Sequence, residues 1–203
     1  MNSESSLEVV EIGLAELMDR WPKTQSYVEL FSDLEHESER GAVLLTAAAL
    51  DDALKDLLRI RLVQAKSTDD LFDGTAPLAT FSARINLSFS VGVISQQEHS
   101  LLHKLRKIRN DCAHVRAIRF HEAPLRDRCL ALKLPYGETC GSSHPVSHYV
   151  IIAQMLVLLL LWRSSQDNLT LSDSPSHPPT RTKDSVVERV SFSVKIPTFR
   201  TQG

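Results

Sequence analysis

The sequence has no excess of charge of either sign and very little cysteine. Its 203 residues carry 23 Lys and Arg against 25 Asp and Glu, a formal net charge of −2. No global basic field therefore draws the protein to nucleic acid, and any such contact needs a local basic patch. The cysteines Cys112, Cys129 and Cys140 contain no CxxC pair, so neither a disulfide framework nor a zinc signature is indicated.

The first residues, "MNSESSLEVV", lack the basic and then apolar segments of a secretory signal. We therefore expect a reducing, cytoplasmic location. The longest apolar run, 149–162, is shorter than the roughly 20 residues that span a bilayer, and Gln154 interrupts it. A helix that is apolar on all sides also suits the centre of a bundle. We expect a buried central helix here, and no membrane contact.

Neither an internal repeat nor a convincing series of strands is present, so the predicted fold class is all-α, a single helical bundle over residues 1–163. Gly74 and Pro77 place a loop at 67–78, with room for one turn at 69–72. The segments with helical spacing of apolar residues are 7–18, 27–34, 38–65, 79–92, 96–115, 124–133 and 149–162.

The last segment, 164–203, is polar and rich in proline and serine, which predicts a linker or a disordered tail. Within it, apolar residues alternate at Val190, Phe192, Val194 and Ile196. Such alternation suits a short strand or a docking peptide.

The clearest local signal is the capping-box spacing of Ser95 and Glu98, which predicts a helix from there to about Val115. On a helical wheel, one side forms an apolar stripe of Leu101, Leu105, Ile108, Cys112 and Val115. The opposite side gathers His99, His103, Arg106, Lys107, Asn110 and His114.

The end of this helix, "LRKIRNDCAH", raises the question of function. Arg109 lies at the edge of the apolar stripe, and Asn110 and His114 are one turn apart. The three residues allow a catalytic site, a polar brace between helices or a solvated face. A zinc site is poorly supported, because the histidines lack a nearby acid or cysteine in a metal-binding arrangement. Cys112 points into the apolar stripe, where a thiol is usually inert packing.

The stretch "RNDCAH", Arg109 to His114, resembles the R-x4-6-H signature of HEPN domains. A longer part of the chain resembles the mannitol-repressor-like family. The matching pieces are "ERGAVLLTAAALDDALKDLLRIRL", "LFDGTAPLATFSARINLSFSVGVISQQE", "LRKIRNDCAH" and "LRDRCLAL". Together they cover roughly residues 39 to 133, and the tail falls outside the resemblance.

The mannitol-repressor resemblance implies an all-α fold without a helix-turn-helix and a transcriptional regulator that acts through protein partners. The net acidity of the chain likewise argues against autonomous DNA binding. This regulator is our first interpretation of the sequence. A structural interaction module with no catalytic role is the third.

The second interpretation comes from the HEPN resemblance, which implies a metal-independent endoribonuclease of the toxin or defence type. Active members dimerise, so that Arg and His of two chains line one cleft, and an antitoxin is a possible protein partner. Arg109, Asn110 and His114 are then the catalytic residues. His114 would move a proton at the ribose 2′-OH or the leaving oxygen, and Arg109 would stabilise phosphate charge. We expect no cofactor and no metal for this reaction.

Overall fold

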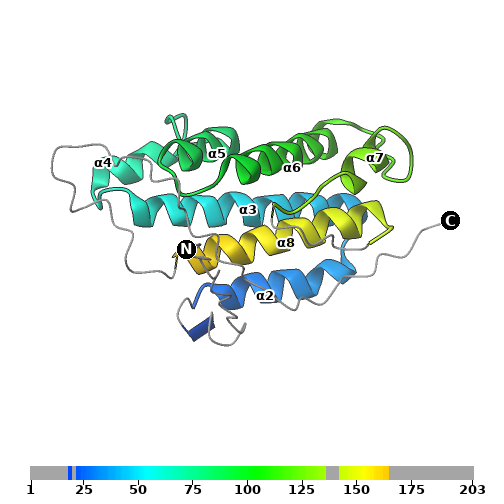
Figure 1. Ribbon diagram of the computed structural model, residues 1–203, viewed down its shortest axis with the longest axis horizontal. Coiled ribbons are helices and arrows are strands. Elements are labelled where there is room, and N and C mark those ends of the chain that lie inside the picture. The colour runs from blue at the N-terminus through cyan, green and yellow to red at the C-terminus, as the bar shows by residue number, and fades with distance from the viewer. Residues whose placement is uncertain (1–17, 20–21, 136–141, 165–203) are drawn as a thin grey trace, which may run out of the picture.

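Helices joined by turns make up the part of the chain that a computed structural model describes, residues 18–19, 22–135 and 142–164. The elements are α2 (Thr24–Asp33), the 3-10 turn η1 (Leu34–His36), α3 (Glu39–Arg61), α4 (Lys66–Asp69), the 3-10 turn η2 (Asp70–Phe72), α5 (Phe81–Ser90), α6 (Gln96–His114), α7 (Leu125–Leu130) and α8 (Pro145–Ser164) (Figure 1). These ranges contain no strand, which confirms the all-α fold class. The helix expected at 7–18 lies almost wholly outside the described residues, as does the tail from residue 165.

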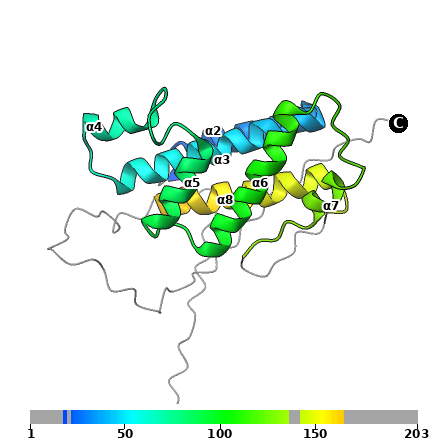
Figure 2. The same cartoon turned by 90° about the horizontal axis from the view of Figure 1, so that it is seen from above.

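Helices α3 and α8 lie side by side at the centre of the bundle (Figures 1 and 2). On one side of this pair, α5 and α6 pack against α3 and against each other. On the other side α2 contacts α8, and α7 packs on α8 and α6 near the end of α6. Helix α6 therefore has one face on the core and another facing outward.

Helix α8 is the predicted central helix, although the argument from length was wrong. The helix has 20 residues, so by length and composition alone it is able to cross a membrane. Burial identifies its role instead, because 94% of its most apolar stretch is covered by the other helices. This is the pattern of the core helix of a bundle.

Most predicted helices are present but end earlier than expected. Helix α3 stops at Arg61, and Val63 beyond it is 76% exposed. The loop expected at 67–78 contains α4 and η2, because Phe72 is buried against Leu58 and Leu78. Helix α5 ends at Ser90. Two residues later, Gly92 has a φ of 77°, a left-handed conformation that glycine adopts without strain.

Candidate functional site

The helix that carries the arginine–histidine motif begins with the predicted capping box. Ser95 Oγ accepts from the Glu98 backbone N–H at 3.2 Å, and the Ser95 N–H donates to Glu98 Oε2 at 2.6 Å. Glu98 is only 1% exposed and also pairs with Arg163 of α8, with 2.9 Å between Oε1 and Nη2. Arg163 Nη1 donates to the Val93 carbonyl at 3.1 Å. Glu98 thereby joins the start of α6 to the end of α8.

Arg109 and Asn110 lie together, half-buried, in the second half of α6. Arg109 Nη1 donates to Asn110 Oδ1 at 3.2 Å. Burial raises the pKa of the Asp51 carboxyl on α3, while Arg84 and Arg109 oppose that rise. Arg109 is therefore close enough to α3 for its charge to act there. This agrees with its predicted position at the edge of the apolar stripe.

His114 is the last residue of α6 and is exposed. Among the described residues it makes no hydrogen bond to Arg109 or Asn110. His114 comes five positions after Arg109, which places the two roughly 140° apart around the helix. One chain therefore does not bring all three side chains into one closed cluster.

Val115 does not belong to the buried stripe, so that part of the wheel prediction was wrong. It follows the helix in an extended conformation, with φ −81° and ψ 123°, and is 45% exposed. The other four predicted members are buried as expected, namely Leu101, Leu105, Ile108 and Cys112. The stripe ends where helical periodicity ends.

Helix α6 carries more basic than acidic residues. Its two acidic residues are both paired, Glu98 with Arg163 and Asp111 with Arg128, where Nη1 and Oδ2 are 2.5 Å apart. The cations that the helix itself contributes are Lys104, Arg106, Lys107 and Arg109. A local concentration of positive charge is therefore present, although the whole chain carries a net charge of −2.

His99 and His103, placed by the helical wheel on the side opposite the apolar stripe, are partly covered by α5. Both Nε2 atoms lie 3.0 Å from Asn86 Oδ1 and 3.2 Å from each other. Burial lowers the pKa of His103, and the charges of His99, Arg106 and Lys107 lower it further. Periodicity within α6 gave no sign of this contact, because Asn86 comes from another helix.

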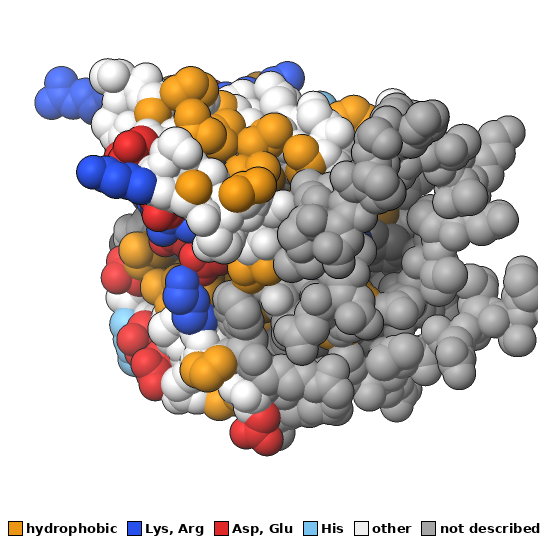
Figure 3. All heavy atoms as spheres, turned by 90° about the vertical axis from the view of Figure 1, so that its left-hand side faces the viewer, with side chains coloured by type: hydrophobic (Ala, Val, Ile, Leu, Met, Phe, Trp, Pro, Cys, Tyr) orange, Lys and Arg blue, Asp and Glu red, His pale blue; other side chains and the backbone are white. Residues whose placement is uncertain are grey.

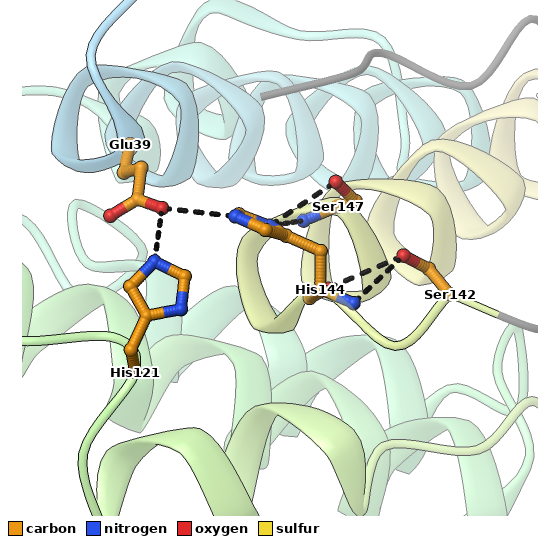
Figure 4. A network of polar contacts seen from close by, with 5 residues as sticks. All are labelled: Glu39, His121, Ser142, His144 and Ser147. Atoms are coloured by element: carbon orange, nitrogen blue, oxygen red, sulfur yellow. Dashed lines mark hydrogen bonds and ion pairs between the residues drawn. The ribbon is translucent and has the colours of Figure 1, made fainter. Parts of the chain in front are cut away.

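A second histidine cluster was missed altogether. Glu39 begins α3, His121 lies between α6 and α7, and His144 precedes α8 (Figure 4). Glu39 Oε1 is 3.0 Å from His121 Nε2 and 3.2 Å from His144 Nε2. Burial lowers the pKa of His144, an effect that Glu39 opposes. No spacing in the sequence connects residues so far apart, so only the fold reveals the cluster.

The predicted inertness of Cys112 agrees with its surroundings. It is fully buried, and burial raises the pKa of its thiol to about 11. Burial likewise raises the pKa of the Cys129 thiol to about 12. Neither forms the thiolate that a nucleophile or metal ligand needs near neutral pH. Cys140 lies outside the described residues.

Comparison of the chain with models of protein families, with curated proteins and with solved structures finds no match. The chemistry of the site therefore has to be argued from its own residues. These are a basic helix, a bonded Arg–Asn pair and an exposed histidine at the helix end.

Proposed function

We propose that the protein is a metal-independent endoribonuclease of the HEPN type that acts as a homodimer. The observation that carries this proposal is the excess of basic residues on α6, a helix whose last residue is the exposed His114. Lys and Arg side chains attract RNA phosphates, and imidazole exchanges protons near neutral pH. The net charge of the whole chain gives no sign of this local excess, and both acids of α6 are paired with arginines from other segments.

The proposed reaction uses the ribose 2′-OH as an internal nucleophile. Its oxygen attacks the adjacent phosphorus, and the bond from phosphorus to the 5′-oxygen breaks. The products are a 2′,3′-cyclic phosphate and a 5′-hydroxyl. His114 takes the proton from the 2′-OH or delivers one to the leaving 5′-oxygen. Arg109 stabilises the charge that develops on the phosphate, and Asn110 orients Arg109 through their hydrogen bond of 3.2 Å.

The position of Arg109 and His114 on one helix supports a site shared by two chains. They point in directions roughly 140° apart, so a single α6 presents them to different places. A second copy related by a two-fold axis can place its His114 beside the first chain's Arg109. In such an interface the reciprocal contact, from the first chain's His114 to the second chain's Arg109, forms as well. The resemblance to HEPN domains implies the same arrangement.

RNA cleavage in the presence of EDTA tests this function. We expect purified protein to cut total RNA and leave cyclic phosphate ends, and His114→Ala to lose cleavage by about 100-fold or more, the contribution of a general acid or base. His36→Ala removes an exposed histidine on η1 and is the matched control, with activity unchanged. Cleavage that persists in His114→Ala, or that EDTA abolishes, would refute the proposal.

The second candidate function is transcriptional regulation through protein partners, which the mannitol-repressor resemblance implies. It is favoured by apolar surface where α3 ends and α4 and η2 lie. There Val63 is 76% exposed and Leu71 is 37% exposed. Figure 3 views the molecule from this end and shows hydrophobic side chains gathered together. Exposed apolar patches of this kind mark protein interaction sites.

Transcription in producing cells separates the two functions. If the apolar surface recruits a regulatory partner, Val63→Asp should abolish changes in transcription initiation that the wild-type protein causes, and His114→Ala should preserve them. Sequencing of newly initiated transcripts measures this. The opposite pattern is that His114→Ala abolishes these changes and Val63→Asp preserves them. It would contradict the regulatory function and leave only the ribonuclease proposal.

A further inference from the structure

We propose that Glu39, His121 and His144 form a binding site for Zn²⁺. The three residues come from different segments, yet their ligand atoms all lie within 4.8 Å of one another. Two imidazoles and one carboxylate are the protein ligands of one class of zinc site, with a fourth position left for water. The site contains neither Arg109 nor His114 and is independent of the proposed ribonuclease.

The distances in the cluster are close to those that zinc requires. Zinc binds histidine nitrogen at about 2.0–2.1 Å and carboxylate oxygen at about 2.0–2.2 Å, so tetrahedral ligand atoms lie about 3.3–3.4 Å apart. Glu39 Oε1 is already 3.0 Å from His121 Nε2 and 3.2 Å from His144 Nε2. Only the two imidazole nitrogens have to approach. His121 lies on a connection outside any helix, between α6 and α7.

The cluster is open to water on the side of His121 and more deeply buried on the side of Glu39 and His144. The side chain of His121 is 47% exposed, whereas those of Glu39 and His144 are 27% and 18% exposed. An ion can therefore enter past His121 and keep a water molecule as its fourth ligand. The carboxylate of Glu39 supplies negative charge that two neutral imidazoles lack.

Ser147 provides the outer partner that a zinc-bound histidine needs. A metal-bound imidazole donates from its other nitrogen to an oxygen or another acceptor. Ser147 Oγ lies 3.3 Å from His144 Nδ1 and can accept this hydrogen bond (Figure 4). Before metal binds, the same Nδ1 accepts from the Ser147 backbone N–H at 3.3 Å. When zinc binds Nε2 of His144, the proton of the ring moves to Nδ1. The hydrogen bond from the Ser147 N–H to Nδ1 is then lost, and Nδ1 donates to Ser147 Oγ instead.

The other histidine cluster is a poorer site, which makes it a useful control. His99 and His103 meet the neutral amide oxygen of Asn86 rather than a carboxylate. Arg106 Nε donates to His103 Nδ1 at 3.4 Å, which places a cation directly beside this ring. Lys107 adds a second positive charge near by, and both cations repel a divalent ion.

Zinc at this site would join the start of α3, the connection between α6 and α7 and the start of α8. A ligand that binds the folded chain but not the unfolded chain raises the melting temperature by mass action. Mg²⁺ should not replace zinc, because imidazole nitrogen is a poor ligand for it. The melting temperature therefore reports the site without any measurement of RNA cleavage.

The test is calorimetric titration of ZnCl₂ into the full chain after EDTA treatment and dialysis, together with thermal melting. We expect one saturable zinc ion per chain and a higher melting temperature with zinc. His121→Ala and Glu39→Gln each remove a ligand and should weaken the affinity by at least the roughly 10–100-fold that loss of an outer partner costs. Their melting temperatures should no longer respond to zinc. His103→Ala should bind like the wild type.

Three results would overturn the proposal. One is the lack of saturable binding by the wild-type chain. Another is unchanged affinity in both His121→Ala and Glu39→Gln, and the third is loss of binding in His103→Ala, which would place the ion at the other cluster. His121→Ala is the principal variant, because its exposed side chain leaves the fold little affected. Failure of zinc binding would leave the ribonuclease proposal untouched, because that reaction is tested in EDTA.

Discussion

At the scale of single residues, the pair His99 and His103 links stability to pH. Burial lowers the pKa of His103, and the positive charges of His99, Arg106 and Lys107 lower it further. Asn86, which faces the pair from α5, carries no charge that would oppose this. The folded chain therefore favours the neutral form of His103, and the unfolded chain takes up a proton first as the pH falls.

The stability that His103 contributes is present above its unfolded pKa of about 6.5 and is lost as the pH falls below that value. We expect the free energy of unfolding in urea to be smaller at about pH 5.5 than at about pH 7.5. The difference should shrink in His103→Gln. His36→Gln, on the exposed η1, is the control and should keep the wild-type difference. An undiminished difference in His103→Gln would assign the pH dependence to other groups.

Sequence reasoning found residues within one helix but missed their partners from elsewhere. It placed Arg109 and Asn110 near each other, and their hydrogen bond of 3.2 Å agrees with that placement. It gave no sign that Asn86 contacts His103, or that Glu39 contacts His121. Helical periodicity reports only which side chains of one helix share a face. Contacts between helices depend on how the bundle is packed, which no spacing along the chain encodes.

At the scale of elements, the start of α6 depends on two separable interactions of Glu98. Its Oε2 accepts from the Ser95 N–H, and its carboxylate pairs with Arg163 at the end of α8. Gln can replace Glu in a capping box but cannot form the ion pair. Substitutions at Ser95 and Glu98 therefore separate the cap from the link between helices.

We expect Ser95→Ala to cost about 0.5–2 kcal/mol of unfolding free energy, as the loss of a helix cap does. Glu98→Ala should cost about 3 kcal/mol, at the lower end for a broken buried pair, because the Arg163 side chain is 21% exposed and keeps some water. Glu98→Gln should fall between the two. Urea denaturation measures all three. Equal losses in Ser95→Ala and Glu98→Ala would show that the ion pair contributes nothing.

A specific local signal predicted the start of α6 better than apolar spacing predicted the end of α7. The capping box fixed the start of α6 at Gln96, as expected. Helix α7, by contrast, ends at Leu130 although the apolar pattern continues to Leu132, which is buried outside the helix. A buried leucine satisfies the apolar pattern in either conformation. Apolar spacing therefore indicates which residues enter the core better than it indicates where helices stop.

At the scale of the whole molecule, the central position of α8 was predictable because it is apolar on every side. The helices that pack against α8 were not predictable from the sequence. The arrangement of α5 and α6 on one side and α2 on the other depends on which apolar stripes fit together (Figure 1). The association of one molecule with another is a further step of the same kind.

We expect the protein to form a homodimer through a face that contains or flanks α6. The reason is that Arg109 and His114 point in different directions from one helix, so a complete site needs two copies. Static light scattering at high micromolar concentration should give twice the chain mass of 22.7 kDa. The same measurement on His36→Ala, which lies on η1, should agree with the wild type. A monomer at that concentration would contradict the shared site.

Mixing two inactive variants tests whether the chains share the site. Arg109→Ala and His114→Ala should each be inactive as homodimers. After joint unfolding and refolding, about half of the dimers carry one chain of each kind if the two chains pair at random. Such a mixed dimer holds one intact Arg109 facing one intact His114, so RNA cleavage in EDTA should return to about a quarter of the wild-type level, with one of two sites restored in half of the dimers. If dimers form but the mixture stays inactive, Arg109 and His114 of different chains do not act together.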